Sequence, residues 1–129
     1  MKYLLDTHAL IWYFEESKRL PQKIEDIIKN PMNQVAISIS SLWEITIKIS
    51  LGKLKLDLPL SDFLDKMVDS DFEIVGIEIE HCKALGELAM IHKDPFDRLI
   101  ISTAIVEECV LISADDNIRK YGNVVVLWD

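Results

Sequence analysis

Short apolar runs recur along the chain, separated by segments in which apolar residues are spaced by three or four positions. The runs around Val35, Val110 and Val124 are continuously apolar, which is typical of strands that are covered on both faces. A shorter run, Tyr3–Leu5, ends at Asp6, and Phe72–Ile77 is a further candidate strand. The predicted strands therefore cover residues 3–5, 35–38, 72–77, 110–113 and 124–127.

Helical spacing and breaking residues predict the segments between these strands. Thr7 and either Ser40 or Ser41 are candidate start positions, Pro21 and Asp94-Pro95 open further helices, and Gly52 ends one. The predicted helices cover residues 7–14, 21–30, 40 or 41 to 51, 61–70, 80–91, 95–108 and a short piece ending at 121. Residues 53–58 alternate Lys and Leu, and are either a brief extended piece or a connector.

The alternation of strands and helices predicts an α/β fold. Strands that are apolar throughout need helices on both faces, so we expect a three-layer α/β/α, Rossmann-like architecture with a mostly parallel central sheet. A length of 129 residues fits a single domain, 1–129, and we see no repeat or linker. In this class, ligands bind at the carboxyl ends of the strands.

Composition and charge exclude several functions. The net charge of −8 disfavours a protein that coats nucleic acid, but it is compatible with a basic partner, a small substrate or a cation-binding acidic cluster. No segment has the length and apolarity of a membrane span, and Asp6 comes too early for a signal peptide. Cys82 and Cys109 form neither a disulfide framework nor a zinc set, which indicates free thiols in a reducing cytoplasm.

Several catalytic motifs are missing from the sequence. The four glycines are too far apart for a dinucleotide or P-loop cradle, and there is no G-x-S-x-G elbow. The three histidines, His8, His81 and His92, lack zinc-site spacing, and we interpret them as surface or capping residues.

Acidic residues, by contrast, gather at the predicted carboxyl ends of the strands. Asp6 follows the first strand, Glu44 lies one turn into the helix after the second, Asp97 lies in the first turn of the helix opened by Asp94-Pro95, and Asp115 follows the fourth strand. Each has a local alternative. Glu44 can close a capping box that begins at Ser41, Asp94 can cap the helix before Asp97, and Asp6 and Asp115 can be turn residues.

Taken together, these four acids predict a metal site. The helix after Asp97 is apolar on nearly every face, so we expect it to be buried and Asp97 to be partly desolvated. Two carboxylates about 6 Å apart repel by about 3 kcal/mol at an effective dielectric constant of 20, so the cluster needs protons or a cation. A site of carboxylate oxygens suits Mg²⁺ or Mn²⁺.

Several motifs along the chain resemble those of PIN-domain proteins. The matching stretches are Leu4–Trp12, Ser41–Ile45 followed by Lys48 and Leu51–Leu54, His92–Ile100, and Ile112–Asp115. They occur in the order and spacing of that family and span residues 1–121. Within the family, the chain is most similar to VapC-type toxins of toxin–antitoxin pairs.

The resemblance implies a metal-dependent ribonuclease in which Asp6, Glu44, Asp97 and Asp115 are the catalytic, metal-binding acids. We expect Asp6 and Asp97 to be the principal metal ligands, and Glu44 and Asp115 to complete the cluster directly or through water. Asp116 is an alternative for the fourth position. Thr7 and Ser41 match small polar residues that lie near the catalytic centre in the family. The resemblance also implies an RNA substrate, hydrolysis that leaves a 5′-phosphate and a 3′-hydroxyl, a homodimer, and an antitoxin that places a basic side chain near the acids. The candidate phosphate contacts, which could equally belong to a solvated helix face, are Lys48, Lys53, Lys55 and Arg98.

Three other functions deserve comparison. A phosphorelay receiver needs an acid pair after the first strand and a lysine after the last, whereas Asp6 is single and no lysine follows Val124. A haloacid-dehalogenase-type phosphatase needs Asp-x-Asp where this chain has Asp6-Thr7-His8. A non-catalytic PIN scaffold that binds RNA or protein would carry the same four acids, so only an activity assay separates it from the enzyme.

Overall fold

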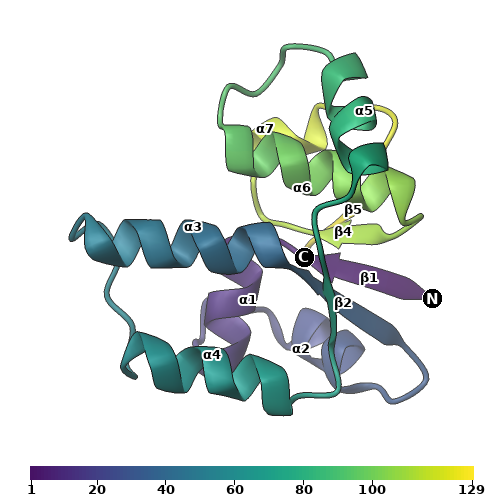
Figure 1. Cartoon of the computed structure of the whole chain (residues 1–129). Helices are drawn as coiled ribbons and strands as arrows, with labels where there is room; N and C mark the ends of the chain where they lie inside the picture. The colour runs from purple at the N-terminus through teal and green to yellow at the C-terminus, as the bar shows by residue number, and fades with distance from the viewer.

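A computed structural model describes residues 1–129 and shows one parallel sheet between helices (Figure 1). The sheet has five strands in the order β3-β2-β1-β4-β5. The strands are β1 Lys2–Leu5, β2 Gln34–Ser38, β3 Glu73–Val75, β4 Val110–Ile112 and β5 Val126–Leu127. The helices are α1 Thr7–Phe14, α2 Gln22–Lys29, α3 Ile39–Ser50, α4 Leu60–Asp69, α5 Ile79–Glu87, α6 Pro95–Val106 and α7 Asp116–Arg119.

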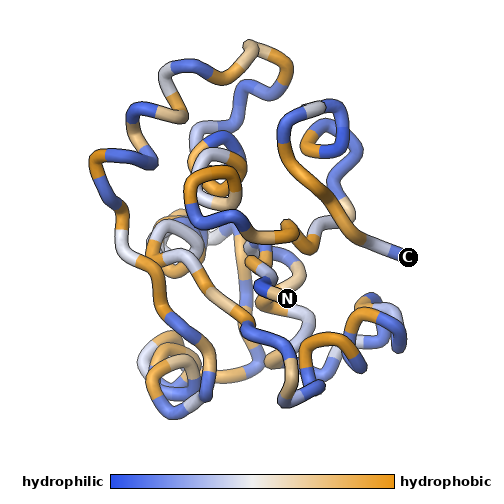
Figure 2. The backbone as a smooth tube through the Cα atoms, turned by 90° about the vertical axis from the view of Figure 1, so that its right-hand side faces the viewer, coloured by the Kyte–Doolittle hydropathy of each residue, from blue (hydrophilic) through white to orange (hydrophobic).

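The two faces of the sheet carry separate apolar clusters. Alternate residues of β1 point to opposite faces, so Leu5 packs with α1, α2, α3 and α4, whereas Leu4 packs with α5, α6 and α7. Both leucines are fully buried. Hydrophobic and hydrophilic stretches alternate along the helices (Figure 2), as expected for elements with one face on a core. These contacts confirm the predicted three-layer α/β/α architecture, and every strand pair is parallel.

The order of the strands positions the predicted acids. β1 lies in the middle of the sheet, and its last residue, Leu5, pairs with Ile37 of β2 and Ile112 of β4. The carboxyl ends of three strands therefore lie side by side. The chain leaves β1 into α1 at Asp6, and leaves β4 toward α7 at Ser113. The first turn of α6 completes this edge, since Phe96 packs against Trp43 of α3.

Most predicted elements are present, but some bounds were wrong. α5 ends at Glu87 rather than near Ile91, because the carbonyl groups of Leu85, Ala89 and His92 accept hydrogen bonds from the Arg98 guanidinium group. β3 and β5 are shorter than predicted, and residues 53–58 form a connector without a strand. None of the helices combines the length and the apolar character that a membrane crossing requires.

Candidate functional site

Asp6 begins the site at the junction between β1 and α1. It is the N-cap of α1: one carboxylate oxygen, Oδ1, accepts a hydrogen bond from the backbone N–H of Ala9 at 2.8 Å. The side chain is buried, and this desolvation raises the pKa of Asp6 above its ordinary value. Hydrogen bonds from Ser113 and Ala9 oppose that rise, and the charge of Asp115 adds to it.

Glu44 points from α3 into the same edge of the sheet. The local alternative for Glu44, a capping box that begins at Ser41, does not form, because α3 begins at Ile39 and its N-cap is Ser38. Glu44 is only 3% exposed. Its Oε1 accepts a hydrogen bond from Thr7 Oγ1 at 2.7 Å, and its Oε2 accepts one from Lys48 Nζ at 2.6 Å. Helix capping therefore does not explain this buried carboxylate.

Lys48 compensates the buried charge of Glu44, and its removal should destabilise the protein. We expect Lys48→Met to lower the free energy of unfolding by about 2 kcal/mol, less than a fully buried pair because Lys48 is partly exposed. The additional change Glu44→Gln should recover most of this loss, since no unpaired charge then remains. Urea unfolding of both variants measures the effect. Lys53→Met, at an exposed position, is the control, and an equal loss there would contradict the explanation.

Asp97 lies in the first turn of α6, and its neighbours disfavour its charge. Asp94 is the N-cap, as predicted, and its Oδ1 accepts hydrogen bonds from the N–H groups of Phe96 and Asp97 at 2.9 and 3.1 Å. Burial, followed by the charges of Asp94 and Glu44, raises the pKa of Asp97 to about 7, although His92 opposes the rise. Without a bound cation, Asp97 is therefore partly protonated near neutral pH.

The raised pKa of Asp97 predicts how the stability of the metal-free protein depends on pH. Between its ordinary value of 3.8 and about 7, Asp97 binds more protons in the folded state than in the unfolded state. Its contribution to stability is therefore fully present below about pH 4 and is lost as the pH rises toward 7. Thermal unfolding in EDTA at pH 5 to 8 should show this decline in the wild type and a smaller decline in Asp97→Asn. Parallel curves for the two proteins would contradict the prediction.

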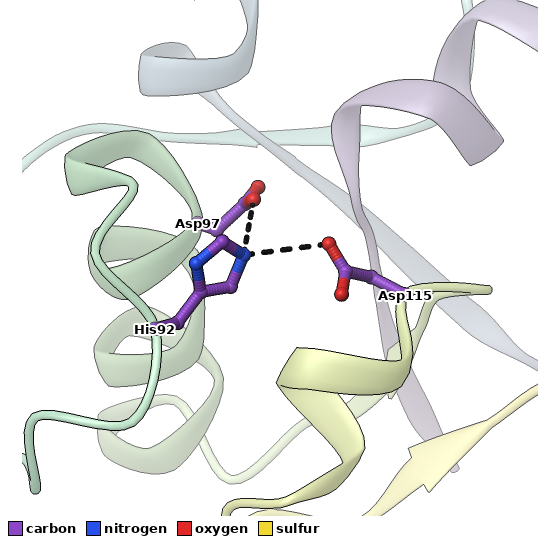
Figure 3. A group of neighbouring side chains, drawn as sticks. All are labelled: His92, Asp97 and Asp115. Carbon is purple, nitrogen blue, oxygen red and sulfur yellow. Dashed lines mark hydrogen bonds and ion pairs between the residues drawn. The ribbon is translucent and has the colours of Figure 1, made fainter.

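Asp115 and His92 complete a tight group with Asp97 (Figure 3). Asp115 is the N-cap of α7, and its Oδ1 accepts a hydrogen bond from Asn117 N–H at 2.7 Å. The other oxygen, Oδ2, lies 3.4 Å from His92 Nε2, and that nitrogen lies 2.9 Å from Asp97 Oδ2. One ligand atom from each of these three residues lies within 4.8 Å of the others. Asp116 is exposed and outside this group, so the geometry favours Asp115 as the fourth acid.

The four predicted acids lie at one edge of the sheet but do not form one equally tight set. Asp97 and Asp115 are in direct reach of each other, whereas Asp6 and Glu44 lie outside the 4.8 Å group. Charge still connects the four, because Asp115 raises the pKa of Asp6 and Glu44 raises that of Asp97. Our interpretation of the histidines missed His92. Its position just before the N-cap of α6 was the available signal, since that places it beside Asp97 at the head of the helix.

Two of the four candidate phosphate contacts are used inside the protein. Lys48 is bound to Glu44. Arg98 donates hydrogen bonds to backbone carbonyl groups and to the hydroxyl of Tyr121. This structural role differs from both expectations for Arg98, a phosphate contact or a solvated helix face. Lys53 and Lys55 are exposed in the connector after α3. Their ammonium groups make no hydrogen bond or ion pair within the protein, unlike the charged groups of Lys48 and Arg98.

The sequence profile of the PIN domain matches residues 3–124. The chain belongs to the PIN domain family. This match confirms the resemblance found in the sequence motifs. Membership of the PIN family, rather than a phosphorelay receiver or a haloacid-dehalogenase-type phosphatase, therefore accounts for the acids at the strand ends.

Other PIN-family comparisons extend over almost the whole chain. Ribonuclease VapC22 from Mycobacterium tuberculosis (strain H37Rv) is 26% identical over 128 residues, which cover 97% of each protein. The crystal structure of VapBC2 from Rickettsia felis, bound to a DNA fragment from the promoter, contains a chain with a TM-score of 0.75, 25% identity and 100% coverage of both chains. VapBC-1 from nontypeable Haemophilus influenzae has a TM-score of 0.73 and 17% identity, covering 98% of this chain and 97% of its own; it shows the shared fold.

The donor atoms of this PIN domain fit a hard divalent cation. Carboxylate oxygens from Asp97 and Asp115 face a common space, with the buried carboxylates of Asp6 and Glu44 nearby. No cysteine belongs to the group, which disfavours a structural zinc site. The raised pKa values of Asp6 and Asp97 show that the protein's own cations do not fully compensate these charges. An oxygen-rich, under-compensated group is what Mg²⁺ or Mn²⁺ binds.

The largest surface hollow of the molecule is elsewhere. It has a volume of about 680 Å³ and lies where β2 and β3 begin, at the opposite edge of the sheet from the acids. Tyr13, Phe14 and Phe72 contribute to its lining, and none of the four predicted acids does. Pocket size therefore does not identify the chemistry of this protein, whereas the convergence of carboxylates does.

Proposed function

We propose that this PIN domain, as a single domain of residues 1–129, is an endoribonuclease that depends on Mg²⁺ or Mn²⁺. The observation that carries the proposal is the pair Asp97 and Asp115, brought within ligand distance at an edge that also holds buried Asp6 and Glu44. These residues come from separate segments of the chain, so local capping does not account for their convergence. Similarity to Ribonuclease VapC22 over 97% of both proteins supports RNA as the substrate.

In this mechanism, Asp97 and Asp115 would hold the cation, and Asp6 and Glu44 would complete its surroundings directly or through water. A bound divalent ion activates water and stabilises charge on a phosphoryl group. The protein supplies rigidity: Asp6 and Asp115 each use one oxygen to cap a helix, which fixes the direction of the other. Thr7 orients Glu44 by donating to its Oε1. No side-chain nucleophile is required.

An exposed aromatic residue beside the acids offers a contact for RNA. Trp43 precedes Glu44 in α3, is 56% exposed, and packs edge-on against Phe96 with ring centroids 5.3 Å apart. Unpaired bases stack on such rings without strong sequence preference. Together with Lys53 and Lys55 as phosphate contacts, Trp43 allows an acidic protein to bind RNA locally.

Cleavage of RNA by the purified protein tests this function. Total RNA incubated with Mn²⁺ should be cut to products with a 5′-phosphate and a 3′-hydroxyl, and EDTA in excess should stop the reaction. Asp6→Asn, prepared in the same way, is the control for contaminating nucleases. Cleavage that persists in EDTA would overturn the metal mechanism. Mn²⁺ binding without any cleavage would favour the non-catalytic PIN scaffold.

We further propose that the protein is the toxin of a toxin–antitoxin pair and acts in the cytoplasm as a homodimer. The structural neighbours include VapBC assemblies and a toxin–antitoxin complex from Klebsiella pneumoniae. A net charge of −8 and the under-compensated acids favour an antitoxin that inserts a basic side chain beside Asp97. Light scattering should give a mass of about twice 14.8 kDa for the dimer. Addition of a basic antitoxin peptide should inhibit cleavage and compete with Mn²⁺.

A further inference from the structure

The imidazole ring of His92 is held in a defined orientation beside the acidic pair. Its Nδ1 accepts a hydrogen bond from the backbone N–H of Asp94 at 3.3 Å, and its own backbone N–H donates to the Tyr121 hydroxyl at 2.9 Å. Since a backbone N–H can only donate, Nδ1 carries the lone pair. The proton of the neutral ring is therefore on Nε2.

The Nε2 atom lies beside two carboxylates that belong to different parts of the fold. Asp97 Oδ2, from the head of α6, lies at 2.9 Å, and Asp115 Oδ2, from the junction of β4 and α7, lies at 3.4 Å. Figure 3 shows the ring between the two acids. Only 14% of the His92 side chain is exposed, so water competes weakly for this donor. A single nitrogen thus contacts both carboxylates, which would otherwise repel each other: it donates a hydrogen bond to Asp115 and lies in close polar contact with Asp97.

We propose that His92 is a positioning residue that sets the separation and orientation of the Asp97 and Asp115 carboxylates for the divalent cation. The proposal deepens the metal-dependent function proposed above and rests on it. The Asp115 oxygen that accepts from His92 keeps a second lone pair, and the Asp97 carboxylate accepts no hydrogen bond from the protein, so both acids keep ligand capacity. Hydrogen-bond partners of metal ligands typically account for 10–100-fold in metal affinity.

Two other roles for His92 make different predictions. As a direct ligand, Nε2 would offer its lone pair to the ion and Nδ1 would carry the proton, which would place two N–H donors, Nδ1 and Asp94 N, against each other. In the second role, a protonated His92 ring would replace the metal as an internal cation. The ring would then compete with the ion, and replacing His92 would raise metal affinity. The observed hydrogen bond from Asp94 to Nδ1 favours positioning over both.

Substitutions that keep or remove the donor test the proposal. His92→Gln retains an N–H at the reach of Nε2, whereas His92→Leu retains bulk without a donor. His8→Leu, an exposed histidine near Asp6 without a hydrogen bond to the acids, is the control. Titration of free Mn²⁺ followed by electron paramagnetic resonance should show affinity 10–100-fold lower in His92→Leu and within about threefold of the wild type in His92→Gln and His8→Leu.

The outcomes separate positioning from its alternatives. Unchanged or tighter Mn²⁺ binding by His92→Leu, or equal losses in the Gln and Leu variants, would overturn the proposal. Electron spin-echo spectroscopy of Mn²⁺-loaded wild type should show no directly coordinated nitrogen, and a coordinated imidazole would also overturn it, even if His92→Leu fails to fold. These measurements use no RNA. Failure of the positioning role with cleavage intact is therefore distinguishable from failure of the nuclease itself.

Discussion

Replacing Asp97 with asparagine should lower RNA cleavage by about 10³-fold while leaving the fold intact. Asparagine keeps the size of the side chain but removes a charge and weakens a metal ligand. Metal-assisted stabilisation of a phosphoryl transition state contributes several kcal/mol, and each 1.4 kcal/mol corresponds to a factor of ten in rate. Because the Asp97 carboxylate is destabilised by burial and by Asp94, its neutral replacement should not reduce the stability of the metal-free protein at pH 7.

The measurement is initial cleavage rate on a fluorescent RNA with saturating Mn²⁺, together with circular dichroism for the fold. Asp116→Asn is a matched control, since Asp116 is an exposed acid directly beside Asp115 and outside the tight group. It should retain at least half of the wild-type rate. A similar loss in both variants would mean that the general negative charge, not a ligand set, supports the activity. A fully active Asp97→Asn would remove Asp97 from the mechanism.

The sequence was sufficient to find the acids because their convergence follows from the topology. Parallel strands place their carboxyl ends at one edge, so Asp6 after β1 and Asp115 after β4 had to approach each other once the order of elements was known. The sequence was not sufficient to choose between Asp115 and Asp116. That choice depends on the angle at which the chain enters α7, and Asp115 takes the N-cap.

The parts that sequence reasoning missed depend on contacts between distant segments. The capping box at Ser41 was plausible locally, but Thr7 and Lys48 hold the Glu44 carboxylate instead. The position of His92 just before the N-cap of α6 indicates its contact with Asp97, but not its hydrogen bond to Asp115, 23 residues away. The early end of α5 has the same kind of cause, a guanidinium group from the following helix. Local patterns predict elements well and long-range hydrogen bonds poorly.

The raised pKa values identify an electrostatic cost that is concentrated at this edge of the sheet. Burial raises the pKa values of Asp6 and Asp97, whereas Lys48 partly compensates the negative charge of Glu44. A divalent cation or a basic side chain from an antitoxin would compensate the same excess charge. The metal ion and the proposed antitoxin would then compete for the same carboxylates.

Arg98 holds the residues around His92 in place through hydrogen bonds. We therefore expect Arg98→Met to lower the free energy of unfolding by about 3 kcal/mol. Its Nη1 donates to the carbonyl of Ala89 at 2.9 Å and to the buried Tyr121 hydroxyl at 3.2 Å, and lies 3.4 Å from the carbonyl of His92. Hydrogen bonds from charged groups contribute about 1.5–3 kcal/mol each and are only partly additive. Methionine fills the volume but removes the charged donor that these acceptors share, and leaves Ala89 and Tyr121 with only the weaker neutral bonds from the Tyr121 hydroxyl and the His92 N–H.

The thermal midpoint of Arg98→Met should fall by about 10 °C, with Arg119→Met, an exposed arginine at the end of α7, unchanged within about 2 °C. Arg98→Lys should recover only part of the loss, because an ammonium group cannot reproduce the planar fork that reaches several carbonyls. Mn²⁺ affinity should also fall in Arg98→Met, since the chain that orients the His92 ring loses its attachment to α6. If stability falls but Mn²⁺ affinity does not, other contacts hold the residues around His92. The proposed effect of Arg98 on the acidic pair through His92 would then be wrong.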